Sequence, residues 1–195
     1  MGLDYAYEIH LPASRVRRAL EAVVDLAPPG EKAATPIVLP GGARLTVPFT
    51  SNFRGDPVDC SDGRNLNLDT SLMFEVGDDE IREFLDEPGG DRAAIGYIYL
   101  TVYFAGGHRP GYAELNFTAA TTGMSLLFER SPSVRRLFTG LAEEAGAACC
   151  LLDKEDSGYE ICWLNGEPRA ASFRATTLAE SEAWWAALAA QWPPA

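Results

Sequence analysis

Two neighbouring segments alternate between apolar and polar residues, at residues 95–104 and 112–119. Because successive side chains of a strand point to opposite faces of a sheet, this period of two predicts a pair of β-strands. The residues between them, 105–111, are rich in glycine and include Pro110, which is typical of a turn. The pattern therefore predicts a long hairpin with one apolar face, formed by Ile98, Leu100, Val102, Phe104, Ala113, Leu115, Phe117 and Ala119.

The opposite face of this hairpin combines aromatic and polar side chains. It carries Tyr97, Tyr99, Thr101, Tyr103, Tyr112, Glu114, Asn116 and Thr118. Three tyrosines on the first strand expose much apolar ring area, and such surfaces often mark a pocket or an interface. The alternative is an ordinary solvated sheet face, because Tyr and Thr favour strands for their own reasons.

Three segments instead show the spacing of an amphipathic helix, at residues 14–27, 131–145 and 177–191. Ser14 is a predicted N-cap of the first, and Ser131 followed by Pro132 is a typical start for the second. The third is expected to bury Leu178, Trp185, Leu188 and Trp192. Helical and strand residues expected to share one core are Leu20, Val23, Leu100, Val102, Leu115, Phe117, Leu137 and Leu141.

Shorter patterns complete the expected fold. Further strands are predicted at residues 5–11, 36–39, 43–47, 66–74, 124–129, 147–152 and 159–164. Asp78 or Asp79 is expected to cap a short helix, and the polar residues 50–64 are expected to form a loop. This mixture predicts an α+β fold, in which a mainly antiparallel sheet carries helices on one face. The length of 195 residues is consistent with a single domain over residues 1–195.

Two parts of the chain share an outline, at residues 1–76 and 94–164, with the helix at 177–191 outside both. Each part has a strand, a long helix and then a hairpin, and each helix begins with a Val-Arg-Arg sequence at Val16 and Val134. We therefore consider two related β-α-β-β halves, which would place a cleft between them. An amphipathic stripe recurs by chance, so the shared Val-Arg-Arg carries most of the weight.

Composition limits the classes of partner. The formal net charge of −12 disfavours nucleic acid and anionic membranes as partners and is compatible with a basic protein partner. No apolar run approaches the roughly 20 residues of a membrane span, and no signal peptide is recognisable. The four cysteines form no C-x-x-C motif, which favours reduced, buried thiols and a cytoplasmic location.

Motifs for catalysis and for cofactors are missing from the sequence. The acidic segment 56–65 does not fit a calcium loop, because Val58 stands where the first ligand belongs. We therefore expect no cofactor and no metal site. Only two histidines occur, His10 and His108, and each is more typical of a surface residue than of a general base.

The strongest candidate site is therefore the polar face of the sheet. We expect it to bind a ligand through Tyr97, Tyr99, Tyr103, Glu114 and Asn116, joined by Glu8 and His10 if their strand lies nearby. The favoured function is a non-catalytic module for a small molecule or a protein partner, or for a second copy of the chain. The alternatives are a small hydrolase or isomerase with Glu114 and His10 as acid and base, and an acidic inhibitor or immunity-type protein.

Overall fold

The structure is a computed structural model that describes residues 2–30, 34–86, 89–106 and 108–195. Its larger sheet contains β1 (Ala6–Pro12), β5 (Leu66–Glu75), β6 (Arg92–Tyr103), β7 (Tyr112–Ala119), β8 (Cys149–Asp153), β9 (Tyr159–Leu164) and β10 (Glu167–Phe173). Its smaller sheet contains β2 (Thr35–Val38), β3 (Arg44–Val47) and β4 (Val58–Asp59). The α-helices are α1 (Val16–Asp25), α2 (Asp79–Leu85), α3 (Thr122–Arg130), α4 (Pro132–Ala145) and α5 (Leu178–Ala189).

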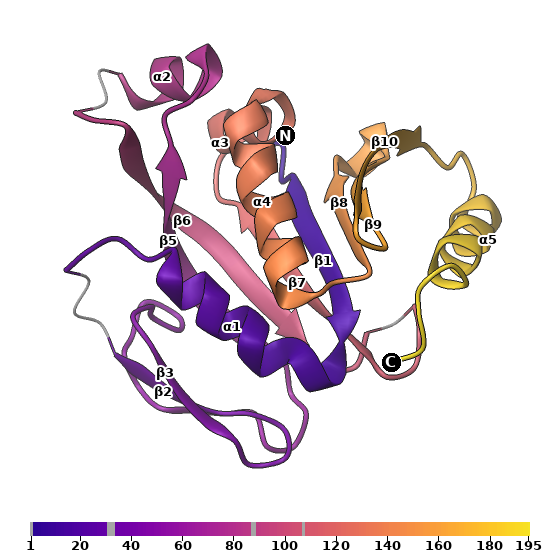
Figure 1. The fold of residues 1–195 in the computed structure, drawn as a ribbon, viewed down its shortest axis with the longest axis horizontal. Helices are drawn as coiled ribbons and strands as arrows, with labels where there is room; N and C mark the ends of the chain where they lie inside the picture. Colours follow the sequence, from indigo (N-terminus) through magenta and orange to yellow (C-terminus); the bar gives the residue numbers. More distant parts are fainter. Residues whose placement is uncertain (1, 31–33, 87–88, 107) are drawn as a thin grey trace.

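The larger sheet has seven strands in the order β10-β9-β8-β1-β7-β6-β5 (Figure 1). Every neighbouring pair in it is antiparallel. The N-terminal strand β1 thus lies in the interior of the sheet, between β7 and β8. The fold is α+β, as the sequence predicted.

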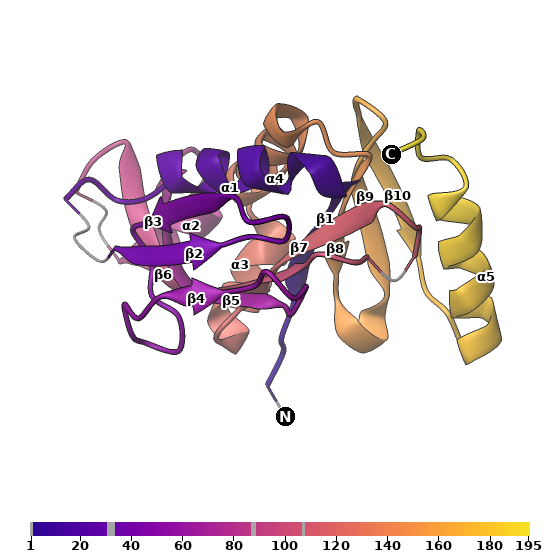
Figure 2. The same cartoon turned by 90° about the horizontal axis from the view of Figure 1, so that it is seen from below.

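One face of this sheet packs against α1, α3 and α4, which form a single core with the small sheet. In both ribbon views α1 and α4 lie side by side over this face (Figures 1 and 2). The face assignment predicted for the central hairpin is confirmed, because Leu100 and Val102 are 1% and 0% exposed whereas Tyr99 is 38% exposed. Seven of the eight expected core residues are buried, and Leu137 is half-buried at the edge of the same core.

Helix α5 packs on the opposite face of the sheet. Trp185, Leu188 and Trp192 join a second apolar cluster there with Tyr112, Cys149, Leu151, Ile161 and Leu164. In Figure 1, α5 lies beyond β8, β9 and β10, at the far side of the sheet from β5. Helices therefore cover both faces of the sheet, with α5 confined to one end of the second face.

Four local predictions were wrong. Residues 124–129 belong to α3 and not to a strand, because Thr121 caps that helix by accepting a hydrogen bond from the Met124 amide at 3.2 Å. Strand β10 was missed, since its sequence lacks apolar alternation and its residues are mostly exposed. Leu178, the first residue of α5, is 76% exposed and does not join the apolar cluster under that helix. Ser14 lies inside a 3-10 helix, Ala13–Arg15, and caps nothing.

Other boundaries agree with the sequence pattern. Asp78 caps α2, Ser131 caps α4, and Gly146 ends α4 in the left-handed conformation with φ of 63°. The predicted loop at 50–64 contains the two-residue strand β4, which pairs with β2. Of the hairpin turn at 105–111, residue 107 lies outside the described residues. The duplication stays a prediction: the strands that follow α4, β8 and β9, join the larger sheet, whereas the strands that follow α1, β2 and β3, lie in the smaller sheet.

Asp78 joins two helices through one carboxylate. Oδ1 accepts a hydrogen bond from the Ile81 amide in α2 at 3.0 Å, and Oδ2 accepts from the Ser133 amide and the Ser131 hydroxyl at 2.8 Å each. We expect Asp78→Ala to lower the free energy of unfolding by about 2–3 kcal/mol, because it leaves amides at two helix N-termini without an acceptor. Urea denaturation measures this. Asp79→Ala removes an exposed neighbour and should cost less than about 0.5 kcal/mol; equal losses in the two variants would contradict the prediction.

Candidate functional site

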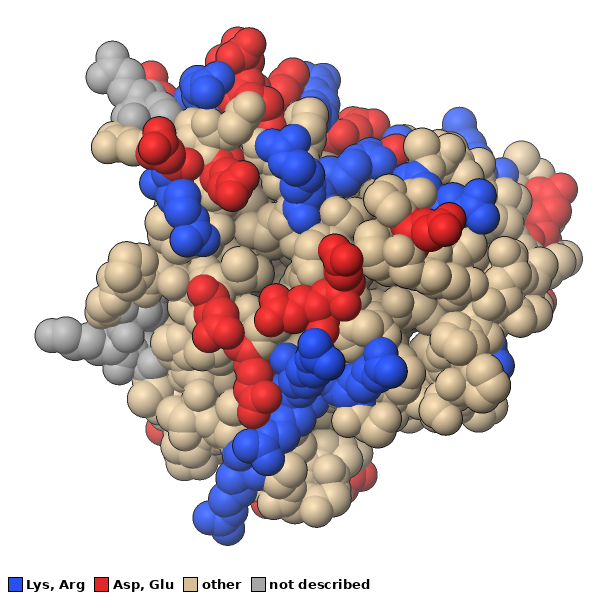
Figure 3. All heavy atoms as spheres, in the orientation of Figure 1, with Lys and Arg blue, Asp and Glu red and all other residues tan. Residues whose placement is uncertain are grey.

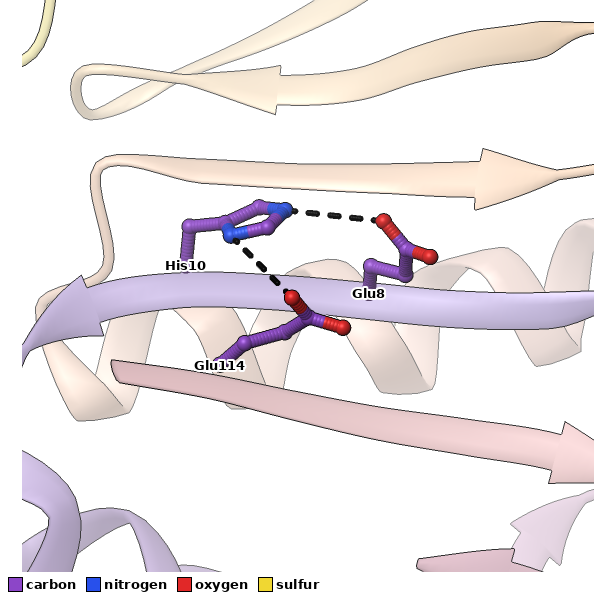
Figure 4. A group of neighbouring side chains, drawn as sticks. All are labelled: Glu8, His10 and Glu114. Carbon is purple, nitrogen blue, oxygen red and sulfur yellow. Dashed lines mark ion pairs between the residues drawn. The ribbon is translucent and has the colours of Figure 1, made fainter. Parts of the chain in front are cut away.

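Pairing of β1 with β7 brings four of the predicted site residues together. Glu8 lies opposite Asn116, and His10 lies opposite Glu114. Residues two apart on a strand share a face, so all four side chains project from the face opposite the main core. Glu8, His10 and Glu114 form what we call the carboxylate–histidine cluster (Figure 4).

The His10 ring lies between the two carboxylates. Its Nε2 is 3.6 Å from Glu8 Oε2, and its Nδ1 is 4.0 Å from Glu114 Oε2, as Figure 4 shows. Both separations exceed a hydrogen bond, and Nε2 has no hydrogen-bond partner in the described part of the chain. The ring is thus held between two acids without being bonded to either.

Asn116 holds the other oxygen of each acid. Its Nδ2 donates to Glu8 Oε1 at 3.3 Å and reaches Glu114 Oε1 at 3.5 Å. The Thr118 hydroxyl donates to Asn116 Oδ1 at 2.7 Å, which fixes the orientation of the amide. This chain of contacts leaves both Oε2 atoms on the histidine side of the cluster.

Aromatic rings from distant parts of the chain cover His10, which is 1% exposed and therefore not the surface residue that the sequence predicted. The ring of Trp192 stacks on it with centroids 5.0 Å apart, and Trp185 meets it edge-on at 5.4 Å. His108 lies 5.8 Å away and stacks on Trp185 at 3.7 Å. The C-terminal segment is held over this site, because Arg109 donates to the backbone carbonyls of Ala189 and Trp192.

Burial dominates the electrostatics of the cluster. It raises the pKa of Glu8 to about 8, with a further contribution from Asp153. It raises the pKa of Glu114 to about 7, where Glu8 adds to the increase and His10 opposes it. It lowers the pKa of His10 to about 4, because a charged imidazole is costly beneath the rings of Trp185 and Trp192, which form an apolar roof over it. Near neutral pH the cluster therefore contains a neutral histidine and at least one protonated carboxyl.

The three predicted tyrosines differ in how close they come to this cluster. Tyr103 lies directly opposite Glu114, and burial followed by the charges of Glu114 and Glu8 raises its pKa. Tyr99 lies opposite Thr118, two pairs farther along the same face, beyond the pair of Thr101 and Asn116. Tyr97 is the extra residue of a β-bulge, with φ of 60° and 67% exposure. The three tyrosines therefore lie progressively farther from the carboxylate–histidine cluster, from Tyr103 beside it to the solvent-exposed Tyr97.

A shallow cavity of about 300 Å³ lies over β5 and β6 beside Tyr99. It is lined by Tyr99 and Thr101 together with Asn67, Asp69 and the exposed ring of Phe53. Asp69 Oδ2 holds the loop in place by accepting from the Phe53 amide at 2.6 Å. The polar face thus has a hollow at one end and the covered carboxylate–histidine cluster at the other.

Several residues around His10 could not be identified from the sequence. Trp185 and Trp192 were predicted to be buried, but nothing showed that they pack on the polar side of the sheet. Asp153 lies just beyond the strand predicted at residues 147–152 and was not considered for the site, although it contributes to the raised pKa of Glu8. Only the strand order and the return of α5 reveal these neighbours, because they lie more than 90 residues from His10 in the chain.

A second hollow, of about 410 Å³, lies on the face that carries α1 and α4. Its lining contains Glu75, Arg92, Arg136 and Glu144. Figure 3 shows this side of the molecule, where basic and acidic side chains lie next to one another. Since the lining carries two arginines and two glutamates, it has no net preference for an anion or a cation.

No protein-family model matches the chain. Neither a curated protein nor a solved structure matches it. Within the described ranges, no helix combines the length and the apolar character needed to cross a membrane. Function is therefore inferred from the geometry of the polar face alone.

Proposed function

We propose that the protein is a non-catalytic module that binds a small molecule through the polar face of its sheet. The ligand would carry a cationic or hydrogen-bond-donating group directed at Glu114 and a flat or apolar part that packs on Tyr103 and Tyr99. One observation carries this proposal: Glu114 lies opposite Tyr103, with its carboxylate largely removed from water. A partly desolvated carboxylate beside an aromatic ring favours a donor or a cation.

Burial of His10 favours binding over catalysis. A general base must come within hydrogen-bond reach of the proton that it removes. His10 is covered by Trp185 and Trp192, and its lowered pKa makes it a weak base. Glu114 and Asn116 remain partly exposed, so they can contact a ligand without any movement of the roof.

The second candidate function is a small hydrolase or isomerase that uses Glu114 and His10 as acid and base, and the properties of Glu114 favour it. Its pKa of about 7 lies near neutral pH, which suits a general acid or base, and it faces His10 at 4.0 Å. In that case Glu114→Gln would abolish turnover of a substrate that it still binds. An inhibitor or immunity-type role stays a prediction that rests on the net charge of −12.

Alanine substitutions of the three tyrosines test ligand binding, because the tyrosines differ in their distance from Glu114. We expect Tyr103→Ala and Tyr99→Ala to weaken binding by about 1–3 kcal/mol through lost ring contact. Tyr97→Ala, which makes the same chemical change at the open end, should have the smallest effect. Thermal-shift screening with alkyl and aryl amines, guanidinium compounds and their neutral amide analogues identifies the ligand class, and calorimetry on the best compound gives the affinities.

Glu114→Gln should remove the preference for amines over amides, because it replaces the desolvated charge with a neutral group of similar shape. Equal binding by all three tyrosine variants, together with an unchanged amine preference, would contradict the proposal. Sedimentation of the wild type and Tyr99→Ala tests the remaining possibility. A shift from dimer to monomer in the variant, with no ligand present, would assign the face to self-association.

A further inference from the structure

We infer that Glu8, His10 and Glu114 form a binding site for a divalent transition-metal ion. Each residue offers one donor atom, and these three atoms all lie within 4.8 Å of one another. The inference uses the same Glu114 carboxylate as the proposed function, and its experiment is designed to separate the two.

The three donor atoms are slightly too far apart to bind a metal ion, and a small shift of the side chains would bring them close enough. A point between three atoms so spaced lies no farther than about 2.8 Å from each, whereas Zn–N and Zn–O bonds are about 2.0–2.2 Å long. Rotation of the two glutamate side chains covers such a difference, because their Oε2 atoms make no hydrogen bond among the described residues. Backbone movement of β1 and β7 is not required.

The unpaired nitrogen of His10 is a second observation that supports a metal site. His10 is almost fully buried, yet its Nε2 faces Glu8 without a hydrogen-bond partner in the described residues. A buried polar atom left unpaired is costly, typically by about 1–3 kcal/mol. A metal ion coordinated by Nε2 and by one oxygen of each glutamate would satisfy this nitrogen, and a neutral imidazole is the form that binds metals.

The surroundings orient the ligands as a metal site needs. Asn116 occupies Oε1 of both glutamates, so the Oε2 atoms are the ones available for coordination. Thr118 in turn fixes the Asn116 amide, and the Trp192 ring restrains the imidazole plane. Outer contacts of this kind typically contribute 10–100-fold to metal affinity.

Charge and donor type indicate the class of metal. Two carboxylates and one neutral imidazole neutralise a divalent cation, which removes the cost of two neighbouring buried acids. Imidazole suits zinc, iron, nickel and copper, whereas calcium prefers six to eight oxygen ligands. Three protein ligands leave a further position on the metal for water or a ligand.

Calorimetric titration of the chelator-treated full chain with ZnCl₂, MnCl₂ and CaCl₂ tests the inference. We expect one Zn²⁺ ion per chain and at least about tenfold weaker binding of Ca²⁺. Glu8→Gln should weaken Zn²⁺ binding at least about tenfold. His108→Gln is the matched control, since His108 lies near the cluster but outside the proposed ligand set, and it should bind Zn²⁺ like the wild type.

Two further readouts keep the outcome clear. Co²⁺ absorption should lack the intense near-ultraviolet bands of thiolate ligation, which excludes binding by the buried cysteines. Circular dichroism and thermal unfolding confirm that Glu8→Gln remains folded. Absence of one-to-one Zn²⁺ binding, or equal affinity in the wild type and Glu8→Gln, would overturn the metal site. If the protein binds amines but not Zn²⁺, the proposed function stands and the metal site is wrong. If it binds Zn²⁺ but shows no preference for amines, the metal site stands and the proposed function is wrong.

Discussion

Replacing Trp192 with alanine is expected to lower the free energy of unfolding by about 3–5 kcal/mol. The side chain is 3% exposed and packs between His10 and Tyr112, at ring-centroid distances of 5.0 Å each. Its loss leaves a cavity over the carboxylate–histidine cluster, and the polar residues below allow water to enter. Denaturant unfolding gives the stability change directly.

The same substitution should also change the titration of His10. Water in the cavity lowers the cost of a charged imidazole, so the pKa of His10 should rise from about 4 toward its ordinary value of 6.5. The His10 ring signals in an NMR titration measure this shift. Trp184→Ala is the control, because Trp184 stacks on Tyr159 and Phe173 instead. A similar His10 shift in both variants would show that the Trp192 ring is not what excludes water.

The second large effect is expected for Glu8→Gln in the metal-free protein. The folded-state pKa of Glu8, about 8, lies above its ordinary value of 4.5, so the folded chain keeps a proton that the unfolded chain releases. The free energy of unfolding therefore falls as the pH rises from about 4.5 to about 8. Glutamine keeps the shape of the protonated acid without this penalty, and at pH 8.5 the variant should be more stable than the wild type by about 2–4 kcal/mol.

Burial and the charged neighbours of Glu8 determine how large the difference becomes. Burial is the main factor that raises the pKa of Glu8, and the charge of Asp153 adds to it, while Glu8 in turn raises the pKa of Glu114. The gain should nearly disappear at pH 4.5, where Glu8 is protonated in the folded chain and about half protonated in the unfolded chain. Glu75→Gln makes the same change at an exposed position and should alter stability by less than about 0.5 kcal/mol at any pH. Parallel stability curves for the wild type and Glu8→Gln would contradict the prediction.

Periodicity alone was enough to predict the fold class and the two faces of the central hairpin. Alternation is informative where one strand face packs on a core and the other does not, as at Leu100 and Tyr99. The shared face of Glu114 and Asn116 followed from the same rule. Their meeting with Glu8 and His10 did not, because sequence patterns do not reveal which strands pair.

The errors have equally specific causes. Residues 124–129 form a short apolar run, for which strand and helix periods are hard to distinguish, and the cap at Thr121 decides in favour of a helix. Strand β10 has no core face, so it produces no alternation. The roof over His10 depends on Trp185 and Trp192 returning from the far end of the chain. Local sequence patterns do not predict packing between segments so far apart in the chain.

The interior position of β1 has a consequence for how the chain folds. Its partners begin at Tyr112 and Cys149, so neither side of this strand can pair until more than 100 further residues are available. Long-range pairing of this kind slows folding, because the entropy of closing the intervening loop is lost before the contacts form. Until then the apolar side of β1, with Tyr7, Ile9 and Leu11, stays uncovered. During synthesis a strand that is fully buried in the folded chain therefore stays exposed and open to aggregation until its partners have been made.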